Sequence, residues 1–524
     1  MSLRVPRRMA VLAALTFVAF LSGCQKQHRA VTTYHYDNLR TGWNHEEKEL
    51  KYDKVQSAHF GLIQNVTLDD QVDTQPLVVP HVDIPAGPSP GVHDVVYVAT
   101  ESNTIYAIDA SSGEILLHPK FGNPVPLPQG CNNNGPNVGI NGTPVIDRAS
   151  NTMYVIVYTL VAGAPTYHIH ALDLNALTDK VPPRVVAASF GAFTFQAAWQ
   201  RQRPALLLAN GNVYAGFGSF CDWGGTHSRG WLLGWQTGSL TPLPANQLND
   251  REATAPNSSL HRFLASIWMS GYGPAADEAG NLFFVTGNSD SNYNVPISIQ
   301  ESVVKMSPDL TTIRDFFTPS NEANLDSGDT DYGSGGAMLL PDQSGSTPHL
   351  IAAAGKDGRM FILNRESMGG STPGGPDKVV TQANIGGCWC GPSYFHHKIV
   401  SSGGSNVILW RIQTSPSTSL QNEGTSEGIG GGAQDPGFFT TVSSDEDDHP
   451  IIWAVSRPSN SSPADISLFA FKAEPSSSGA LDPLFQAPAG TWPNTGGNSN
   501  IVPVVANGKV YVASYKQLSI FGMH

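Results

Sequence analysis

The stretch that decides the fold is Asp94–Leu116, DVVYVATESNTIYAIDASSGEIL. It holds two short runs rich in β-branched and aromatic residues, Val95–Thr100 and Thr104–Asp109, and then the turn Ser111-Ser112-Gly113. Such short runs predict β-strands, and the Ser-Ser-Gly sequence predicts a tight turn before a third, outer strand. The stretch therefore predicts a small antiparallel sheet.

Variants of this stretch recur to the end of the chain. Aligned on the central residue of the first strand, the copies fall at Tyr97, Tyr154, Tyr214, Phe284, Ile351, Ile399, Trp453 and Tyr511. Neighbouring copies lie 48 to 70 residues apart, longer than the roughly 40–45 residues of a minimal four-stranded blade. A further strand precedes each pair, and in seven copies a proline opens it: Pro76, Pro144, Pro204, Pro274, Pro392, Pro436 and Pro503. Proline is tolerated at the first residue of a strand because no ladder hydrogen bond is lost there.

Antiparallel sheets repeated radially form a β-propeller, which leaves only short sheet edges. The sequence thus predicts an all-β protein, an eight-bladed β-propeller of four-stranded antiparallel blades. Seven blades are the alternative, if the weak sixth copy belongs to a neighbouring blade. The last copy ends at His524 after about three strands, so we expect Phe60–Leu68 to supply the missing one.

The strand pair ending AIDASSGEIL resembles the pyrroloquinoline quinone-like (PQQ-like) propeller repeat of the quinoprotein alcohol dehydrogenase-like family, and the resemblance covers most of the chain after residue 60. The segments TYHYDNLRTGWN, from Thr33, and CWCGPSYF, from Cys388, resemble those of bacterial secreted lipoproteins with this repeat. The resemblance implies one of two functions. Some members are dehydrogenases that use PQQ and calcium, with a glutamate and an asparagine on the metal and an aspartate as base. Another is a lipoprotein of the outer-membrane assembly machinery, which uses no quinone and binds protein partners.

The sequence departs from the dehydrogenase pattern. It has no adjacent Cys-Cys pair and no C-x-x-C-H haem motif, and Leu116 or Leu117 stands where the repeat has tryptophan. No glutamate, asparagine or aspartate can be matched to the calcium and base positions. We therefore expect no cofactor, with PQQ and calcium as the alternative.

The N-terminus is predicted to be a targeting segment. Arg4, Arg7 and Arg8 precede an apolar run too short to span a bilayer, and LSGC, ending at Cys24, resembles a bacterial lipobox. This implies a lipoprotein signal peptide at residues 1–23 and lipid on Cys24. Gln25 follows the cysteine, which favours an outer-membrane address in the cell envelope. Residues 24–58 are expected to be a tether and an N-terminal segment packed on the edge of the propeller, which spans 59–524.

The charge limits the partners. Removal of residues 1–23 deletes three arginines and no acid, so the formal charge changes from −13 to −16. Such a surface disfavours nucleic acid and anionic lipid. We expect membrane contact through the lipid only, and an envelope protein, a small molecule or a saccharide as ligand.

One face of the propeller is predicted to be rich in loops. In an antiparallel blade, the turns between the first and second strands lie on one face of the propeller. The loops between the second and third strands lie on the opposite face, together with the connections between blades. In this sequence the turns on the first face are short, whereas the loops and connections on the opposite face are long. The four cysteines that follow Cys24 all fall on this loop-rich face: Cys131, Cys221, Cys388 and Cys390. They are expected to form disulfides that staple loops, with pairing undetermined, or to bind metal.

Candidate site residues also fall on this face. The loop CDWGGTHSRGW offers Asp222, His227 and Arg229 for acid–base work or for clamping an anion, and the same residue types also serve as turn caps. Trp268 and Trp389 are candidates for the mouth of the central channel, for cofactor binding or for packing. Asp326, Asp329 and Asp331 are either calcium ligands or a solvated acidic loop, because their spacing misses the D-x-[DN]-x-[DN]-G pattern.

His396 and His397 are read as strand neighbours that point to opposite faces. These observations predict a lipid-anchored binding scaffold that works through its loop-rich face without a quinone. A periplasmic PQQ- and calcium-dependent dehydrogenase is the alternative, and an extracellular saccharide-active enzyme is the second alternative.

Overall fold

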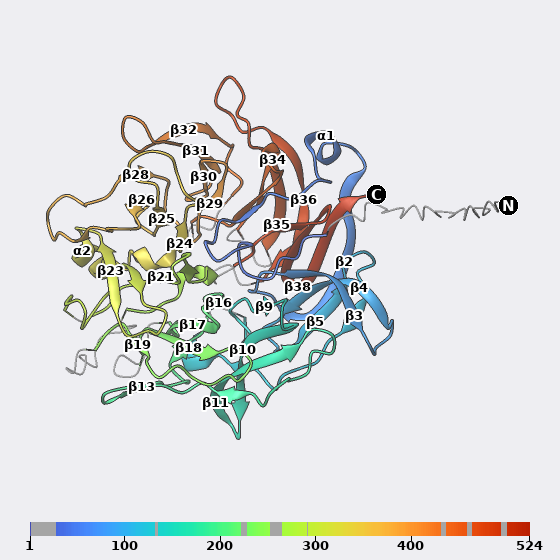
Figure 1. Ribbon diagram of the computed structural model, residues 1–524, viewed down its shortest axis with the longest axis horizontal. Coiled ribbons are helices and arrows are strands. Elements are labelled where there is room, and N and C mark those ends of the chain that lie inside the picture. Colours follow the sequence, from blue (N-terminus) through green and yellow to red (C-terminus); the bar gives the residue numbers. More distant parts are fainter. Residues whose placement is uncertain are drawn as a thin grey trace.

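The computed structural model describes Met1 and residues 28–131, 135–221, 228–251, 265–290, 292–430, 436–457, 464–493 and 500–524. The predicted lipidation site Cys24 and almost all of the predicted signal peptide lie outside these residues. Within them, no helix is both long and apolar enough to cross a membrane. Eight antiparallel sheets are arranged around one centre, and the chain visits them in order, so the colours of Figure 1 follow the ring.

The first four blades follow the predicted order from the innermost strand outward. Blade 1 contains β3 (Leu77–Ile84), β4 (Gly91–Ala99), β5 (Ile105–Asp109) and β6 (Ile115–Leu117). Blade 2 contains β9 (Val145–Asp147), β10 (Thr152–Val161), β11 (Ala164–Asp173) and β12 (Arg184–Val185). Blade 3 contains β16 (Leu207–Ala209), β17 (Asn212–Ser219), β18 (Trp231–Gln236) and β19 (Gln247–Leu248), and β15 (Gln200–Arg201) also pairs with β17. Blade 4 contains β20 (Ala275–Ala276), β21 (Leu282–Val285), β22 (Val303–Met306) and β23 (Ile313–Thr318), to which β27 (Gly370–Ser371) adds in parallel.

The remaining blades keep this order. Blade 5 contains β24 (Ala337–Leu339), β25 (Leu350–Ala354), β26 (Arg359–Asn364) and β28 (Thr381–Asn384). Blade 6 contains β29 (Ser393–Phe395), β30 (Lys398–Ser401), β31 (Ile408–Gln413) and β32 (Ser419–Thr425). Blade 7 contains β33 (Thr440–Asp445), β34 (Asp448–Val455), β35 (Ala464–Lys472) and β36 (Pro483–Trp492), with β1 (Trp43–Asn44) parallel to β33. Blade 8 contains β37 (Val504–Ala506), β38 (Lys509–Met523) and β2 (Phe60–Gln71).

Other elements are short. Two hairpins decorate the loops, β7 (Val125–Pro126) with β8 (Asn137–Val138) and β13 (Ser189–Phe190) with β14 (Phe193–Thr194). Among the described residues, the helices are α1 (Tyr52–Val55), α2 (Glu322–Gly328) and three 3-10 turns, η1 (Pro128–Gly130), η2 (Met269–Gly271) and η3 (Tyr332–Ser334).

The two ends of the chain close the ring together. The long strand β38 pairs with β37 at its start and with β2 over its second half, where Phe60 faces Met523 and Gln71 faces Tyr515. Figure 1 shows the C-terminus beside β2. Both predictions are confirmed: the propeller has eight blades, and the segment near residue 60 supplies the outer strand of the last one.

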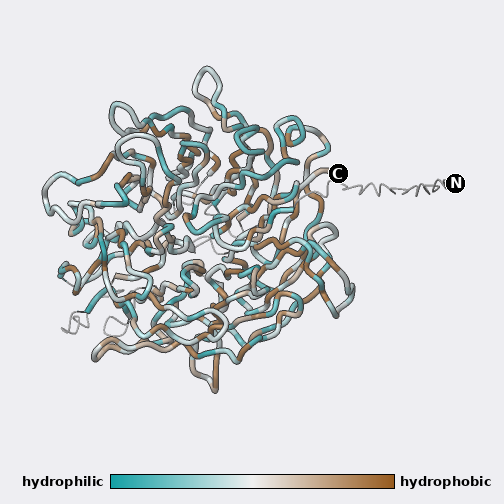
Figure 2. The backbone as a smooth tube through the Cα atoms, in the orientation of Figure 1, coloured by the Kyte–Doolittle hydropathy of each residue, from teal (hydrophilic) through white to brown (hydrophobic). Residues whose placement is uncertain are grey.

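The core lies between neighbouring blades. Separate clusters of buried side chains join blade 1 to blade 2, blade 8 to blade 1 and blade 7 to blade 8. Apolar residues recur along the strands in every part of the ring (Figure 2). Alternating strand residues thus pack against the next blade, as the period of two requires.

Residues 31–44, which we call the strap, cross the central channel and form hydrogen bonds with all eight blades. Its backbone pairs with Val78 of blade 1 and meets the innermost strands of the following blades in turn through Thr32, Asn38, Leu39, Thr41 and Gly42. The Asn38 side chain reaches Leu208 O of blade 3 at 2.9 Å, and Asn44 Nδ2 donates to Val505 O of blade 8 at 2.9 Å. Residues 31–44, which were expected to pack on the edge of the propeller, therefore fill its centre.

Arg40 holds the strap in place. Its side chain is fully buried, and Nε donates to Pro274 O at 2.9 Å while Nη2 donates to Leu206 O at 3.1 Å. Nη1 donates to Thr33 Oγ1 at 2.7 Å and to the carbonyl of Tyr34 at 3.0 Å. Burial lowers the pKa of the Arg40 guanidinium to about 10, so it remains charged at neutral pH. The guanidinium thus satisfies buried carbonyls from two blades and from the strap itself.

The acidic run from Asp445 to Asp448 forms a hairpin tip between β33 and β34. The interpretation of His396 and His397 as strand residues was wrong. Both lie in the turn between β29 and β30 with φ of 42° and 60°, because the chain reverses there after a strand of only three residues.

We expect Arg40→Ala to lower the free energy of unfolding by about 4 kcal/mol or more. The substitution leaves several buried carbonyls without a donor, each at about 1–3 kcal/mol. Chemical denaturation measures the change. Arg411→Ala is the control, since that side chain is 55% exposed and ion-paired with Glu423 at the surface, where such pairs contribute about 1 kcal/mol or less. Equal losses in the two variants would contradict the role given to Arg40.

Candidate functional site

A pit of about 120 Å³ opens on the loop-rich face. Its lining comes from loops that precede innermost strands or follow second strands: Arg201, Arg203, Ser219, Cys221, Ser266, Trp268, Asn288, Asp329, Asp331, Lys356 and Trp389. Antiparallel blades bring these ends to one face. The pit combines aromatic rings with charged side chains, and all of these except Asp329 are largely withdrawn from water.

Trp268 and Trp389 meet at the pit. Their rings contact edge to face with centroids 5.3 Å apart. Trp268 leads into η2, and four residues further on the buried ring of Tyr272 packs edge-on against Tyr34 and His35 of the strap, with centroids 5.1 and 5.0 Å away. The strap therefore supports from behind the loop that carries Trp268.

The Tyr272 ring fits only because two neighbours are glycines. A Cβ atom at Gly336 or Gly391 would lie 1.9 or 2.1 Å from this ring. The Tyr272 hydroxyl donates to Arg40 O at 2.7 Å. These contacts fix the floor beneath the pit.

Lys356 is held in a cage of oxygens and rings. Its Nζ lies 2.5 Å from Asp331 Oδ2, 3.1 Å from Asp329 Oδ1 and 3.0 Å from Asp329 O. The same atom lies 4.7 Å from the ring centroid of Trp389 and 5.6 Å from that of Trp268. Burial would lower the pKa of Lys356, but the charges of Asp331 and Asp329 outweigh it and raise the pKa. The raised pKa keeps Lys356 positively charged at neutral pH.

Further carboxyl groups lie behind this cage. Glu301 is fully buried and accepts from Tyr332 N at 2.6 Å. Burial, with the nearby Asp331 and Asp326, raises the pKa of Glu301. Burial and the Glu322 side chain raise the pKa of Asp326 to about 9. The raised pKa values favour the protonated form of both groups.

Arg201 and Arg203 form the opposite wall and are 4% and 3% exposed. Arg201 Nε donates to Asn141 Oδ1 at 3.1 Å, and Arg203 Nη2 donates to Asn500 Oδ1 at 3.2 Å. The Arg203 guanidinium stacks 5.2 Å from the Trp268 centroid. Two buried guanidinium groups thus lie beside the rings.

Arg201 also faces buried acid. Glu101 accepts from Gly139 N and from Asn141 Nδ2, both at 2.6 Å. Burial, together with the charge of Asp73, raises the pKa of Glu101. Arg201 is thus tied to a hydrogen-bonded network of blades 1 and 2.

The four cysteines form two disulfides with different roles. Cys131–Cys221 spans 90 residues and joins two long loops beside the pit, so closure of a loop this long stabilises the fold by about 4–5 kcal/mol. A disulfide on the loop-rich face is thus present, as expected, and it pairs Cys131 with Cys221. Cys388–Cys390 spans two residues, so it restricts its own short segment and contributes little through loop closure.

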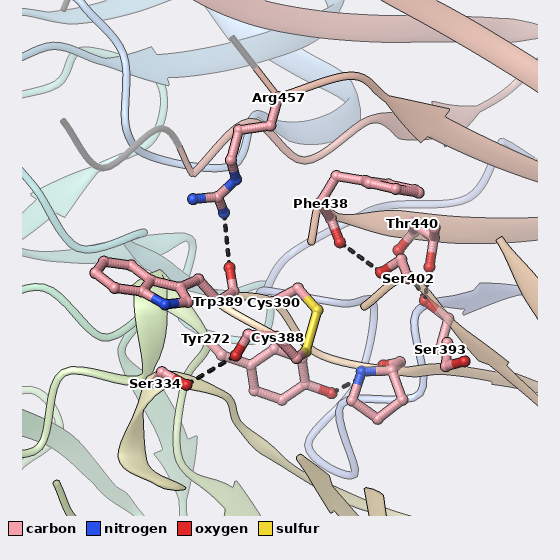
Figure 3. The surroundings of a disulfide bond; sticks show 12 residues. Tyr272, Ser334, Cys388, Trp389, Cys390, Ser393, Ser402, Phe438, Thr440 and Arg457 are labelled. Atoms are coloured by element: carbon pink, nitrogen blue, oxygen red, sulfur yellow. Dashed lines mark hydrogen bonds between the residues drawn. A yellow bond between two sulfur atoms is a disulfide. The ribbon is translucent and has the colours of Figure 1, made fainter. Parts of the chain in front are cut away.

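The short disulfide holds the peptide that presents Trp389. Figure 3 shows the Arg457 guanidinium pointing to Trp389 O, to which it donates at 2.6 Å. Ser334 Oγ donates to Cys388 O at 2.7 Å. Both sulfur atoms are buried, and their bond excludes the alternative of metal binding by these cysteines.

The predicted candidates are brought together only in part. Trp268, Trp389, Asp329 and Asp331 line the pit, whereas Asp326 lies on α2 and accepts from Ser289 N at 3.0 Å. Asp331 is 4% exposed, so the stretch is not simply a solvated acidic loop. Arg229 is not part of the pit lining. It lies 3.5 Å from Asp250 Oδ1 and 4.4 Å from the Phe193 centroid. Asp222 and His227 lie outside the described residues.

Six pit residues were not predicted from the sequence: Arg201, Arg203, Ser219, Ser266, Asn288 and Lys356. Each stands before an innermost strand, or at or just after the end of a second strand. The signal that marks them is this position in the repeat, since both positions converge on the channel mouth.

PQQ and calcium, which the family resemblance implies, do not fit the described part of the pit. The volume of about 120 Å³ is below the roughly 300–1,000 Å³ of pockets for larger ligands. A quinone between the indoles needs parallel rings, but Trp268 and Trp389 are inclined at 72° and touch. Asn288 and Asp331 are of the types that the dehydrogenases use, yet the Lys356 ammonium already occupies the position between the carboxylates. Within the described ranges, no group of three His, Cys, Asp or Glu side chains is arranged for a metal.

Lys356→Met is expected to lower the free energy of unfolding by about 3–5 kcal/mol at pH 7, because buried Asp331 loses its cation. The loss should shrink on acidification. A buried carboxylate that has lost its cation takes up a proton more readily than the same group in the unfolded chain. The loss of folding free energy is therefore present at high pH, where the carboxylate is charged, and disappears at low pH, where it is protonated. Denaturant titrations at several pH values measure this. Lys516→Met, on the strand β38, is the comparison. A pH-independent loss would contradict the cage.

No model of a known protein family matches the chain, and no curated protein matches it in sequence. Among solved structures it is similar to the quinohemoprotein alcohol dehydrogenase ADHIIG from Pseudomonas putida HK5, with a TM-score of 0.58 and 13% identity over 94% of this chain and 80% of that one. A europium-containing methanol dehydrogenase gives a TM-score of 0.55 and 12% identity over 94% and 98%. BamB from Moraxella catarrhalis gives a TM-score of 0.48 and 10% identity over 88% of this chain and 100% of that one. This TM-score is too low to support a conclusion about this chain. At these identities the first two matches establish the fold alone: the chain has the β-propeller architecture of PQQ-dependent alcohol dehydrogenases.

Proposed function

We propose that this protein is a lipid-anchored, exported binding scaffold whose loop-rich face binds its ligand or partner around the central pit, without a quinone. The observation that carries the proposal is the position of Lys356. Its ammonium group uses both carboxylates of the pit, and the two tryptophans close on the same group. A site built this way recognises a ligand through charge and aromatic contact.

The loop-rich face is the working surface for two reasons. The strap closes the channel behind the pit, so access comes from the loop side. Both disulfides also lie on this side and hold loops that have little core of their own. The expected occupants are an envelope protein or a small molecule or saccharide.

A PQQ- and calcium-dependent dehydrogenase is the second candidate. It is favoured by the fold likeness and by Asn288 and Asp331 at the pit. It would require the two indoles to separate and Lys356 to leave its carboxylates.

A titration of the full chain in detergent with PQQ and calcium distinguishes the two candidates. We expect no saturable binding at high micromolar PQQ, because the pit is small and its carboxylates are paired with Lys356. Absorbance and calorimetry are the readouts, and a known quinone dehydrogenase is the positive control. Stoichiometric binding would refute the scaffold proposal and direct the work to alcohol and sugar substrates.

The proposed anchor has its own test. Cells that express the chain should incorporate labelled fatty acid into it, and the protein should fractionate with membranes. Cys24→Ser should remove both properties, whereas Ser22→Ala, a small residue at the neighbouring lipobox position, should keep them. Label retained in Cys24→Ser would show that this cysteine carries no lipid.

A further inference from the structure

The chain joins the propeller at a fixed corner, where blades 8 and 1 meet. His28 Nδ1 lies 2.5 Å from Asp94 Oδ2 of blade 1. Arg29 N donates to Asn507 Oδ1 at 2.8 Å, and Asn507 stands in the turn that joins β37 to β38 in blade 8. Turns between first and second strands lie on the face opposite the loop-rich face, which we call the short-turn face.

The length of chain before this corner limits where a lipid anchor can lie. The proposed lipid site, Cys24, is four residues before His28, and four residues span at most about 14 Å in any conformation. The strands are longer than this reach. The ten residues of β10 rise about 33 Å from the short-turn face to the loop-rich face. A lipid on Cys24 therefore holds the bilayer near this corner, and the loop-rich face lies at the far end of the strands.

An uncharged segment covers blade 1 beside the corner. Its sequence is IPAGPSPGV, Ile84–Val92, and it spans the turn between β3 and β4. The Ser89 hydroxyl donates to Glu114 Oε1 at 2.7 Å, so the segment folds over the outer part of the blade. Most of its residues are exposed, and Val92 is 65% exposed. The segment presents to the outside a surface without charge.

Blade 8 adds exposed apolar side chains at the same end. Leu62 near the start of β2 and Met523 at the end of β38 are both 39% exposed, and both lie at the short-turn ends of their strands. A hollow of about 280 Å³ adjoins them. Its lining includes His28, Lys48, Ile63, Asn507, Lys509 and Met523.

The charges of this corner are balanced, although the whole chain has a formal charge of −13. Residues 46–54, EEKELKYDK, contain four acids and three lysines. Arg29 and Lys509 lie beside them, and Arg29 Nη1 lies 2.9 Å from Glu46 Oε2. The acidic character of the protein is therefore concentrated elsewhere on its surface.

We propose that this corner of the short-turn face lies against a surface of zwitterionic phospholipid headgroups, so that the loop-rich face and the pit point away from the membrane. The inference rests on the lipid anchor of the proposed function. It adds a protein surface to the lipid, which was the only membrane contact expected from the sequence. Exposed apolar side chains enter the headgroup region in proportion to the apolar area they bury there, and a corner without net charge approaches a zwitterionic surface without repulsion.

The experiment uses the lipidated full chain on vesicles of phosphatidylethanolamine and phosphatidylcholine that carry a headgroup-linked quencher. A fluorescent probe is attached at Val92→Cys or, in a second variant, at Met523→Cys. The four cysteines that follow Cys24 are disulfide-bonded and do not compete for the probe. Val161→Cys is the matched control, because Val161 is also exposed, at 47%, and stands at the β10–β11 hairpin tip on the loop-rich face.

We expect quenching of the probes at positions 92 and 523 and none at position 161. Addition of phosphatidylglycerol to the vesicles should not strengthen the quenching, because an anionic surface repels the acidic chain.

The outcomes separate this inference from the anchor on which it rests. Quenching at position 161 as strong as at position 92 would overturn the inference, as would absence of quenching at both 92 and 523 in a chain whose lipid is verified by mass spectrometry. Quenching that requires phosphatidylglycerol would overturn the assignment of a zwitterionic surface. A chain that carries no lipid and does not bind the vesicles would overturn the anchor itself, and the inference with it.

Discussion

The fully buried guanidinium of Arg40 is the interaction on which the rest of the molecule depends. A propeller buries its strands between blades but leaves an axial channel lined by the innermost strands. The strap fills that channel, and Arg40 connects it to carbonyls of blades 3 and 4. The strap also adopts left-handed backbone at His35, Tyr36 and Arg40, which costs about 1 kcal/mol or more per residue. The hydrogen bonds to all eight blades offset that cost.

The candidate site inherits its rigidity from this arrangement. Strap aromatics pack on Tyr272, and the same loop presents Trp268 to the pit. On the other side, the Cys388–Cys390 disulfide and Arg457 hold Trp389. The indoles and Lys356 thus form a preorganised wall, which keeps the ordering cost of ligand binding low.

The fold could be predicted from the sequence because its signals are local. Each signal lies within a few residues: the short strands around Tyr97 and its copies, the turns that follow them and the prolines that precede them. The number of blades follows from counting the copies of the strand. The pit could not be predicted in this way. Lys356 stands in AGKDGR and resembles any polar turn, and its burial depends on Asp329 and Asp331 of the preceding connection. The burial of Arg40 was missed for a related reason. The strap is polar, and a polar segment is expected at the surface. Its burial depends on hydrogen-bond acceptors that lie in other blades, far away in the sequence.

Closure by both ends of the chain has a consequence for the order of assembly. The strap and β2 are made first, yet their partners in blade 8 lie in the last residues, from Val504 to Met523. Contacts between such distant residues make folding slow, since loop-closure entropy is lost before they form. Without these final residues β2 has no partner strand, so the native ring requires them. Because synthesis proceeds from the N-terminus, the ring closes only once β38 becomes available.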